Sequence, residues 1–198
     1  LHSLQFIGPD GEKKFLTGGR VAGCYSSIGP VNEAQPLCIA EGFATAATIH
    51  EASGYPVAVA FNDGNLERVA RALREKCPDG ELILCADDDA ATAGNPGLTK
   101  AKAAALAVGG KITSPDFGAD RPAGMSDFND LMQIHGAEAV KRQIEAAILA
   151  ASTNGDPINA MLEGAGLAAL RAGASMTSVE EAVRALVALL AGVDDIRL

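Results

Sequence analysis

Two apolar stretches of the sequence run directly into acidic residues: LCIAEG at residues 37–42 and LILCADDD at residues 82–89. The apolar part of each is four or five residues long, which is the usual length of a buried strand. Helical patterns follow at 43–53 and 98–108. Strands that alternate with helices are typical of a parallel sheet covered by helices on both faces. The sequence therefore predicts an α/β fold.

The same alternation continues through residues 36–135, which we expect to form one domain. Between the two acidic stretches, the pattern predicts a strand at 57–61 and a helix at 65–77. A last strand is predicted at 111–113. The expected domain is thus a parallel sheet flanked by helices.

The two flanks of this domain have different patterns. Residues 1–35 predict a short β leader, with a hairpin of strands at 4–7 and 13–16 and a third strand at 21–25. Residues 136–198 predict a helical appendage that is rich in Ala and Leu. Helices near the C-terminus are expected at 127–134, 138–150, 157–172 and 178–190.

The composition excludes several classes of protein. Hydrophobic residues make up 48% of the 198 residues, which excludes a disordered chain. No apolar run reaches the roughly 18 to 20 residues that span a bilayer, so no membrane partner is expected. The four cysteines lack a C-x-x-C spacing, which favours free thiols in the cytoplasm. A net charge of −9 argues against a general nucleic-acid coat, but not against an enzyme that handles nucleotides through metal ions.

The acidic residues follow the predicted strands at the point where parallel sheets carry their chemistry. Glu41 comes directly after the first strand, and Asp87 and Asp89 come after the other, with Asp88 as a spacer that points away. Carboxylates that converge in this way repel one another, and a hard divalent cation is the usual compensation. A D-x-D turn alone is common after strands, but its combination with Glu41 at the same sheet edge is more specific. The pattern predicts a site for Mg²⁺ or Mn²⁺.

Four stretches, in this order, make residues 36–135 resemble a toprim domain: EGF at 41–43, FNDGNL at 61–66, DDD at 87–89 and SDFND at 126–130. This catalytic fold is shared by type IA and type II topoisomerases, bacterial-type primases and certain nucleases. The resemblance is to primases of plasmids, phages and integrated mobile elements in particular. It implies a toprim-like parallel sheet flanked by helices.

The resemblance also implies roles for the acidic residues. Glu41 is expected to act as a general acid/base or metal ligand, and Asp87 and Asp89 are expected to hold Mg²⁺ or Mn²⁺. Asp127 is expected to be a further metal ligand.

Two positions depart from the pattern of replicative bacterial primases. Thr45 and Asn129 stand where those primases have acidic residues. The number of metal ions is therefore left open.

Four further residues are candidate nucleotide contacts. Lys100 and Lys102 follow the acidic loop and could meet phosphates, although a solvated surface charge is the alternative for each. Asn62 and Asn65 could hydrogen-bond a substrate, although Asn beside Gly is first a turn residue.

The leading hypothesis is the catalytic fragment of a DNA primase, which makes RNA primers from NTPs on a single-stranded DNA template. Metal ions would align the reacting groups of this phosphoryl transfer. A replicative helicase, or a helicase domain of the same chain, is an expected partner, and a zinc-binding template module is expected outside these residues. The alternatives are a toprim nuclease, a topoisomerase component that would need Tyr25 or Tyr55 as nucleophile, and a non-catalytic nucleic-acid or partner-binding module.

Overall fold

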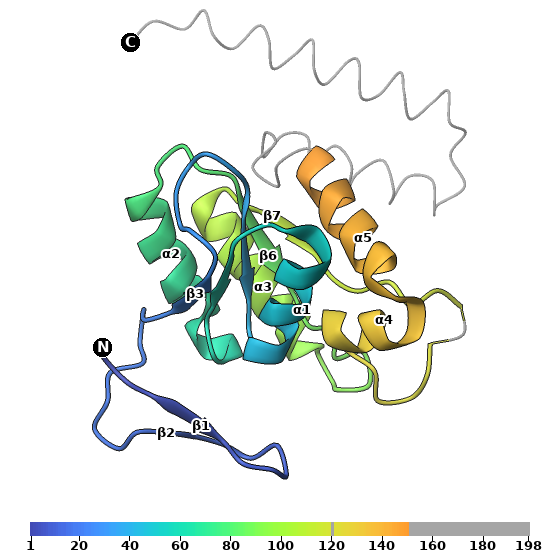
Figure 1. Cartoon of the computed structure of the whole chain (residues 1–198), viewed down its shortest axis with the longest axis horizontal. Coiled ribbons are helices and arrows are strands. Elements are labelled where there is room, and N and C mark those ends of the chain that lie inside the picture. The colour runs from blue at the N-terminus through green and yellow to red at the C-terminus, as the bar shows by residue number, and fades with distance from the viewer. Residues whose placement is uncertain (120, 151–198) are drawn as a thin grey trace, which may run out of the picture. The chain divides into compact units, whose positions relative to one another are not determined.

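A five-stranded sheet with the order β3–β5–β4–β6–β7 lies at the centre of the part of the chain that the structure describes (Figure 1). The computed structural model describes residues 1–119 and 121–150. Four strands are parallel, and β3 pairs antiparallel with β5 at one edge. The strands are β3 (Ser26–Ile28), β4 (Leu37–Ala40), β5 (Val57–Val59), β6 (Leu82–Cys85) and β7 (Lys111–Thr113).

Helices cover both faces of this sheet (Figure 1). One face carries α2 (Leu66–Lys76) and α3 (Pro96–Val108), and the other carries α1 (Phe43–Ser53), α4 (Phe128–His135) and α5 (Ala137–Leu149). Alternate strand residues belong to the two layers: Ile39 and Leu84 pack with α2 and α3, whereas Cys38 and Ile83 pack on the opposite face. The pleat of a strand imposes this alternation, and burial on both faces explains why the strands are apolar throughout. The predicted α/β fold is confirmed.

The predicted hairpin is also present. Its strands are β1 (Gln5–Ile7) and β2 (Lys13–Phe15), which pair antiparallel with Gln5 opposite Phe15. We call β1, β2 and their turn the leader hairpin. The ring of Phe15 meets the ring of Phe61 edge-on, with 6.0 Å between the centroids, so the hairpin contacts the domain at the end of β5.

The strand predicted at 21–25 is wrong. These residues form turns and irregular backbone, and the strand follows them as β3. The physical reason is the side-chain amide of Asn65, which binds this segment. Its Oδ1 accepts from the amide of Gly23 at 2.8 Å, and its Nδ2 donates to the carbonyls of Val21 and Cys24 at 3.2 and 3.0 Å.

The contacts cross both predicted domain limits. β3, from the expected leader, joins the edge of the sheet, and α5, from the expected appendage, packs against α1. The helices expected at 157–172 and 178–190 lie outside the described residues. Within the described ranges, no helix is long and apolar enough to cross a membrane.

Replacing Asn65 tests its structural role. The side chain is only 3% exposed and also donates to the carbonyl of Ala60 at 2.9 Å, so Asn65→Ala leaves buried backbone groups without partners. We expect the free energy of unfolding to fall by about 2 to 4 kcal/mol in urea denaturation. The control is Asn32→Ala, whose amide makes an exposed hydrogen bond and whose loss is expected to cost less than about 1 kcal/mol. Equal losses for the two variants would contradict this role.

Candidate active site

Acidic residues follow three neighbouring strands at the carboxyl edge of the sheet. Glu41 follows β4, Asp63 lies after β5, and Asp87 and Asp89 follow β6. We call Glu41, Asp87 and Asp89 the carboxylate cluster. The charges of the three act on one another: Asp89 raises the pKa of Glu41, and both Glu41 and Asp89 raise the pKa of Asp87. The structure thus places these acids near enough for their charges to act on one another.

Asp87 is the most perturbed carboxyl group of the cluster. Burial, followed by the negative charges of Glu41, Asp127 and Asp89, raises the pKa of Asp87 from 3.8 to about 7. Its Oδ1 atom is buried and, among the described residues, has no hydrogen-bond partner. A buried carboxylate oxygen without a donor is costly, so this atom would gain from a bound cation.

Glu41 is perturbed for similar reasons. Burial raises the pKa of its carboxyl group, with further contributions from the charges of Asp63 and Asp89. The positive charges of Lys13 and Lys100 oppose this rise. The cluster therefore holds more negative charge than its neighbours neutralise.

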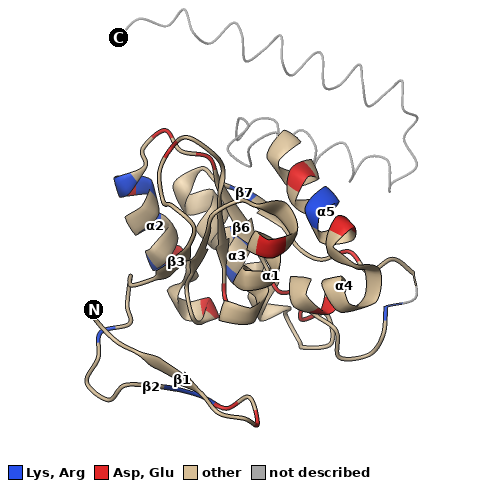
Figure 2. Cartoon of the chain, viewed as in Figure 1, with Lys and Arg blue, Asp and Glu red and all other residues tan. Residues whose placement is uncertain are grey.

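Lys13 is a site residue that the sequence analysis missed. It lies on β2, and its Nζ atom is 3.8 Å from the position that a Cβ atom would take at Gly42, directly after Glu41. The leader hairpin thus carries a cation to the acidic edge of the domain; Figure 2 shows the basic residues of β2. The local pattern offered only one signal: Lys13 and Phe15 alternate onto the same face of a strand.

The start of α3 holds Asp89. The amide of Gly97, in the first turn of this helix, donates to Asp89 Oδ2 at 3.2 Å. A Cβ atom at Gly97 would lie 2.7 Å from the carbonyl oxygen of Asp87 and 2.9 Å from Asp89 Oδ2, so only glycine allows this approach. The positive end of the helix dipole stabilises a carboxylate there.

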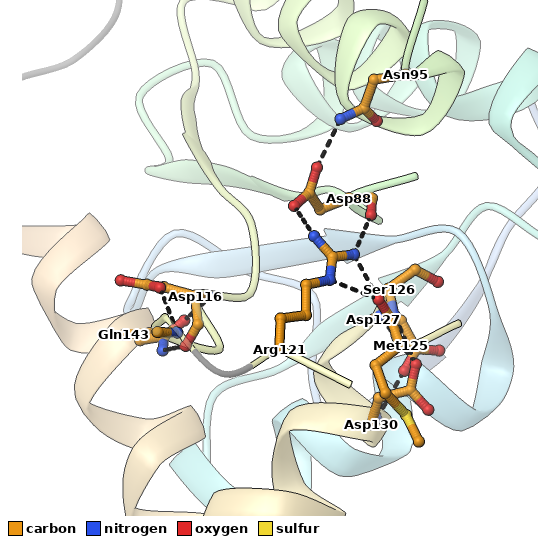
Figure 3. A network of polar contacts seen from close by, with 10 residues as sticks. Asp88, Asn95, Asp116, Arg121, Met125, Ser126, Asp127, Asp130 and Gln143 are labelled. Carbon is orange, nitrogen blue, oxygen red and sulfur yellow. Dashed lines mark hydrogen bonds and ion pairs between the residues drawn. The ribbon is translucent and has the colours of Figure 1, made fainter. Parts of the chain in front are cut away.

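Asp88 is not a free spacer, because Arg121 and Asn95 bind it (Figure 3). The guanidinium of Arg121 forms an ion pair with the Asp88 carboxylate and also donates to the carbonyls of Asp88 and Met125. Its Cζ atom lies 4.9 Å from the centroid of the Phe117 ring. We call this arrangement the Arg121 clamp. Asp88 is thus engaged by Arg121 and Asn95, and the clamp fixes the loop that carries Asp87 and Asp89.

Asp127 acts first as the N-cap of α4. Its Oδ1 accepts from the amide of Asp130 at 2.8 Å, and the Asp130 side chain accepts in return from the backbone of Asp127, which makes a capping box. Its Oδ2 accepts from the hydroxyl of Thr45 at 2.8 Å. Thr48 similarly donates to Asn129 Oδ1 at 3.1 Å. The positions that lack the expected acids thus form hydrogen bonds between α1 and α4.

The four predicted nucleotide contacts lie in different surroundings. Lys100 forms an ion pair with Asp63, and its charge lowers the pKa of Glu41. Lys102 is exposed on α3, and in the described structure its charge is not among those that shift the pKa of Glu41 or Asp87. Asn62 is half-buried at the start of the 3₁₀ turn Asp63–Asn65. The prediction of Asn65 as a substrate contact is wrong, because its buried amide already binds four backbone groups.

Comparison with known proteins identifies the domain. A family profile described as a Toprim domain matches residues 36–138, which is more than half of the chain. The chain belongs to the toprim family.

The toprim chain is also similar to two curated relatives, both named DNA primase TraC and both from Escherichia coli. It is 45% identical to each over 122 residues, or 58% of this chain. The match covers 12% of the length of one relative and 8% of the other, so the chain spans a small part of each. No solved structure matches the chain.

The donor chemistry of the toprim carboxylate cluster fits a hard divalent cation, because carboxylate oxygens are the ligands that Mg²⁺ prefers. The orphaned Asp87 Oδ1 supports this fit. Within the described part of the chain, however, no three His, Cys, Asp or Glu side chains stand together as a group able to hold a metal ion. Mg²⁺ commonly takes one or two protein carboxylates and completes its shell with water and substrate phosphates.

The raised pKa of Asp87 predicts a pH dependence of metal binding. Below about pH 7 a proton occupies the carboxyl group and competes with the cation. We therefore expect the dissociation constant for Mn²⁺ to rise about tenfold for each pH unit below about 7, and to level off above it. Isothermal titration calorimetry between about pH 5.5 and 8.5 would measure this. Asp87→Asn is expected to lose both the affinity and the pH step, and Asp79→Asn, an exposed control, neither; a flat profile in the unaltered protein would contradict the prediction.

The Arg121 clamp predicts a second effect on metal binding. Arg121→Gln removes the ion pair to a largely buried Asp88, and we expect an affinity for Mn²⁺ about tenfold lower, with a loss of about 2 kcal/mol in stability. Arg121→Lys keeps the charge but lacks the planar fork, so an intermediate result is expected.

The matched control for the clamp is Arg71→Gln. It breaks an exposed ion pair with Glu67, so we expect a change in stability within about 0.5 kcal/mol and unaltered Mn²⁺ binding. If Arg121→Gln lowered the stability but left the Mn²⁺ affinity intact, the clamp would have no part in positioning the cluster.

Proposed function

We propose that this chain is the catalytic part of a DNA primase, which joins NTPs into short RNA primers on single-stranded DNA with Mg²⁺ or Mn²⁺. The observation that carries the proposal is the buried carboxylate cluster with its orphaned Asp87 oxygen. It lies in a toprim chain that is 45% identical, over 122 residues, to proteins named DNA primase. The roles of Glu41, Asp87 and Asp89 as catalytic and metal-binding residues, and of Asp127 as a further ligand, are part of this proposal.

The residues of the site would divide the work of nucleotidyl transfer. The bound metal supplies alignment of the phosphate and relief of the charge that develops on its oxygens. Asp87 and Asp89 would bind the metal ion at the edge of the sheet. The positive charges of Lys13 and Lys100 both lower the pKa of the Glu41 carboxyl group, so both ammonium groups act at the site. They would meet the phosphate oxygens of a bound nucleotide.

Glu41 would handle the proton. A 3′-hydroxyl oxygen forms the new bond to the α-phosphorus of an NTP, the bond to the bridging oxygen breaks, and pyrophosphate leaves. The hydroxyl proton passes to a carboxylate oxygen of Glu41. Burial and neighbouring acids raise the pKa of Glu41, which makes it a better base for this step than an exposed glutamate.

The wider setting of the protein is proposed on the same basis. A single-stranded template and NTPs are the substrates of primer synthesis, and a helicase, separate or in the same chain, is the partner that would supply the template. A cytoplasmic location and a mobile element as the genetic source accord with this function.

The two tyrosines speak against a topoisomerase. The hydroxyl of Tyr25 lies 3.4 Å from Nζ of Lys76, at the C-terminal end of α2, and Tyr55 directly precedes β5. Tyr55 is at the edge of the sheet opposite the carboxylate cluster, because it precedes β5 and the cluster follows the carboxyl ends of the parallel strands. Tyr25 precedes β3, opposite the end of β5, but its hydroxyl is engaged with Lys76. The position of Tyr55 and the contact of the Tyr25 hydroxyl with Lys76 thus favour the primase over a topoisomerase.

Primer synthesis can be tested directly with the 198-residue protein. We expect incorporation of labelled NTPs on a single-stranded DNA template with Mn²⁺ or Mg²⁺, and a loss of at least about a hundredfold in Glu41→Gln, because the proton acceptor is removed. Glu75→Gln makes the same chemical change at an exposed position near the end of α2 and is expected to keep full activity.

Other outcomes would point to the alternatives. DNA cleavage without NTPs, lost in Glu41→Gln, would favour a toprim nuclease. Binding of single-stranded DNA with neither synthesis nor cleavage would favour a non-catalytic module.

A further inference from the structure

We propose that a cavity between the leader hairpin and the toprim domain binds the nucleoside part of the nucleotide whose phosphates meet the carboxylate cluster. The inference rests on the proposed function for the position of those phosphates. The cavity has a volume of about 580 Å³ and is lined by residues 1–4, both strands of the leader hairpin, the segment that follows it, Phe43 and Phe61. This volume is within the range of small-ligand sites.

Three phenylalanine rings, together with Tyr25, form the aromatic part of the cavity wall. Phe15 comes from β2, Phe43 is the first residue of α1, and Phe61 follows β5. Phe43 is 47% exposed, which leaves a large apolar ring uncovered at the wall of a cavity. Any nucleobase can stack on such a ring, because every base has a flat aromatic face.

The backbone of Phe61 gives independent support. Its φ angle is +72°, in the left-handed region that bulky residues rarely adopt. Strained residues of this kind persist where the surrounding structure holds them, and they are concentrated at ligand clamps and active sites. Here the unusual backbone keeps an aromatic ring at the cavity, in edge-on contact with Phe15.

The phenylalanines that line the cavity are close in sequence to the charged residues of the site. Phe15 is two residues after Lys13, Phe43 is two after Glu41, and Phe61 is two before Asp63. On β2 this spacing puts Lys13 and Phe15 on one face of the strand. A ligand with an aromatic base at one end and phosphates at the other would therefore contact rings and charges from the same three segments.

These observations select a nucleoside triphosphate as the occupant. A purely apolar ligand would leave Lys13 and the carboxylate cluster unused, and inorganic phosphates would leave the rings unused. Since the wall offers ring faces, we expect all four bases to bind, with purines binding more tightly than pyrimidines because of their larger stacking area.

The test compares ATP with inorganic triphosphate, each as its Mn²⁺ complex, by calorimetry on the full chain. We expect ATP to bind the unaltered protein about tenfold more tightly, because only ATP has a base to stack. Phe43→Ala is expected to remove this difference and to leave the affinity for triphosphate unchanged. Phe43→Leu, which keeps apolar volume but no ring, guards against a loss of folding and is expected to fall between the two.

The matched control is Phe6→Ala. Phe6 is 56% exposed on β1 but does not line the cavity, because its neighbours Gln5 and Ile7 do and successive strand residues face opposite sides. This variant is expected to bind ATP and triphosphate as the unaltered protein does. In primer synthesis, Phe43→Ala is expected to raise the KM for NTPs while kcat is retained.

The outcomes separate the cavity from the proposed function. Equal affinities for ATP and triphosphate in the unaltered protein would overturn the nucleoside site and leave the metal and phosphate site intact. A loss of ATP affinity in Phe6→Ala equal to that in Phe43→Ala would also overturn it. Failure of the unaltered protein to bind Mn²⁺ and triphosphate would overturn both proposals.

Discussion

Repulsion between Glu41, Asp87 and Asp89 is the force that the surroundings of the sheet edge must counteract, because burial removes the water that would screen these charges. The topology makes the repulsion unavoidable. β4 and β6 are adjacent and parallel, so residues that follow them emerge at the same edge. Among the described residues, the positive charges of Lys13 and Lys100 offset this negative charge only in part. The pKa of Asp87 remains raised, and its Oδ1 atom has no partner among the described residues.

The surrounding contacts fix the positions of the acidic residues but do not cancel their negative charge. The start of α3 fixes Asp89 through Gly97, and the Arg121 clamp binds Asp88 instead of the acids on either side of it. Were Arg121 to pair with Asp87, the fold would be more stable but the negative charge would be cancelled. The hydrogen bonds from Thr45 to Asp127 and from Thr48 to Asn129 likewise join α1 to α4 without adding a positive charge. The carboxylate cluster thus keeps a negative charge that a cation would compensate, while the surrounding hydrogen bonds fix the positions of its residues.

The parts that could be predicted from the sequence depend on local patterns. The period of apolar residues gave β4, α1 and β6 closely, and the position of acids after two strands was enough to expect Glu41 and Asp87 at one edge. The rest depends on contacts between distant segments. Nothing near Lys13 or Arg121 indicates that either reaches the acidic loops, and the amide of Asn65 looks like part of an ordinary turn. β3 was misplaced because Ser26–Ile28 has little apolar pattern and becomes a strand only by pairing with β5.

The misplaced segment and the missed lysine have one cause, which is the way the leader is attached. Asn65, at the start of α2, binds the backbone of residues 21–24, while the Phe15 ring meets Phe61 at the end of β5. The leader hairpin and the segment that follows it are thereby each attached to the domain, and the alternation of β2 then brings Lys13 toward Glu41. A segment with little core of its own can contribute to the site only because the domain supplies this anchorage. The buried amide of Asn65 therefore bears on the acidic edge indirectly, by holding the segment that follows the hairpin.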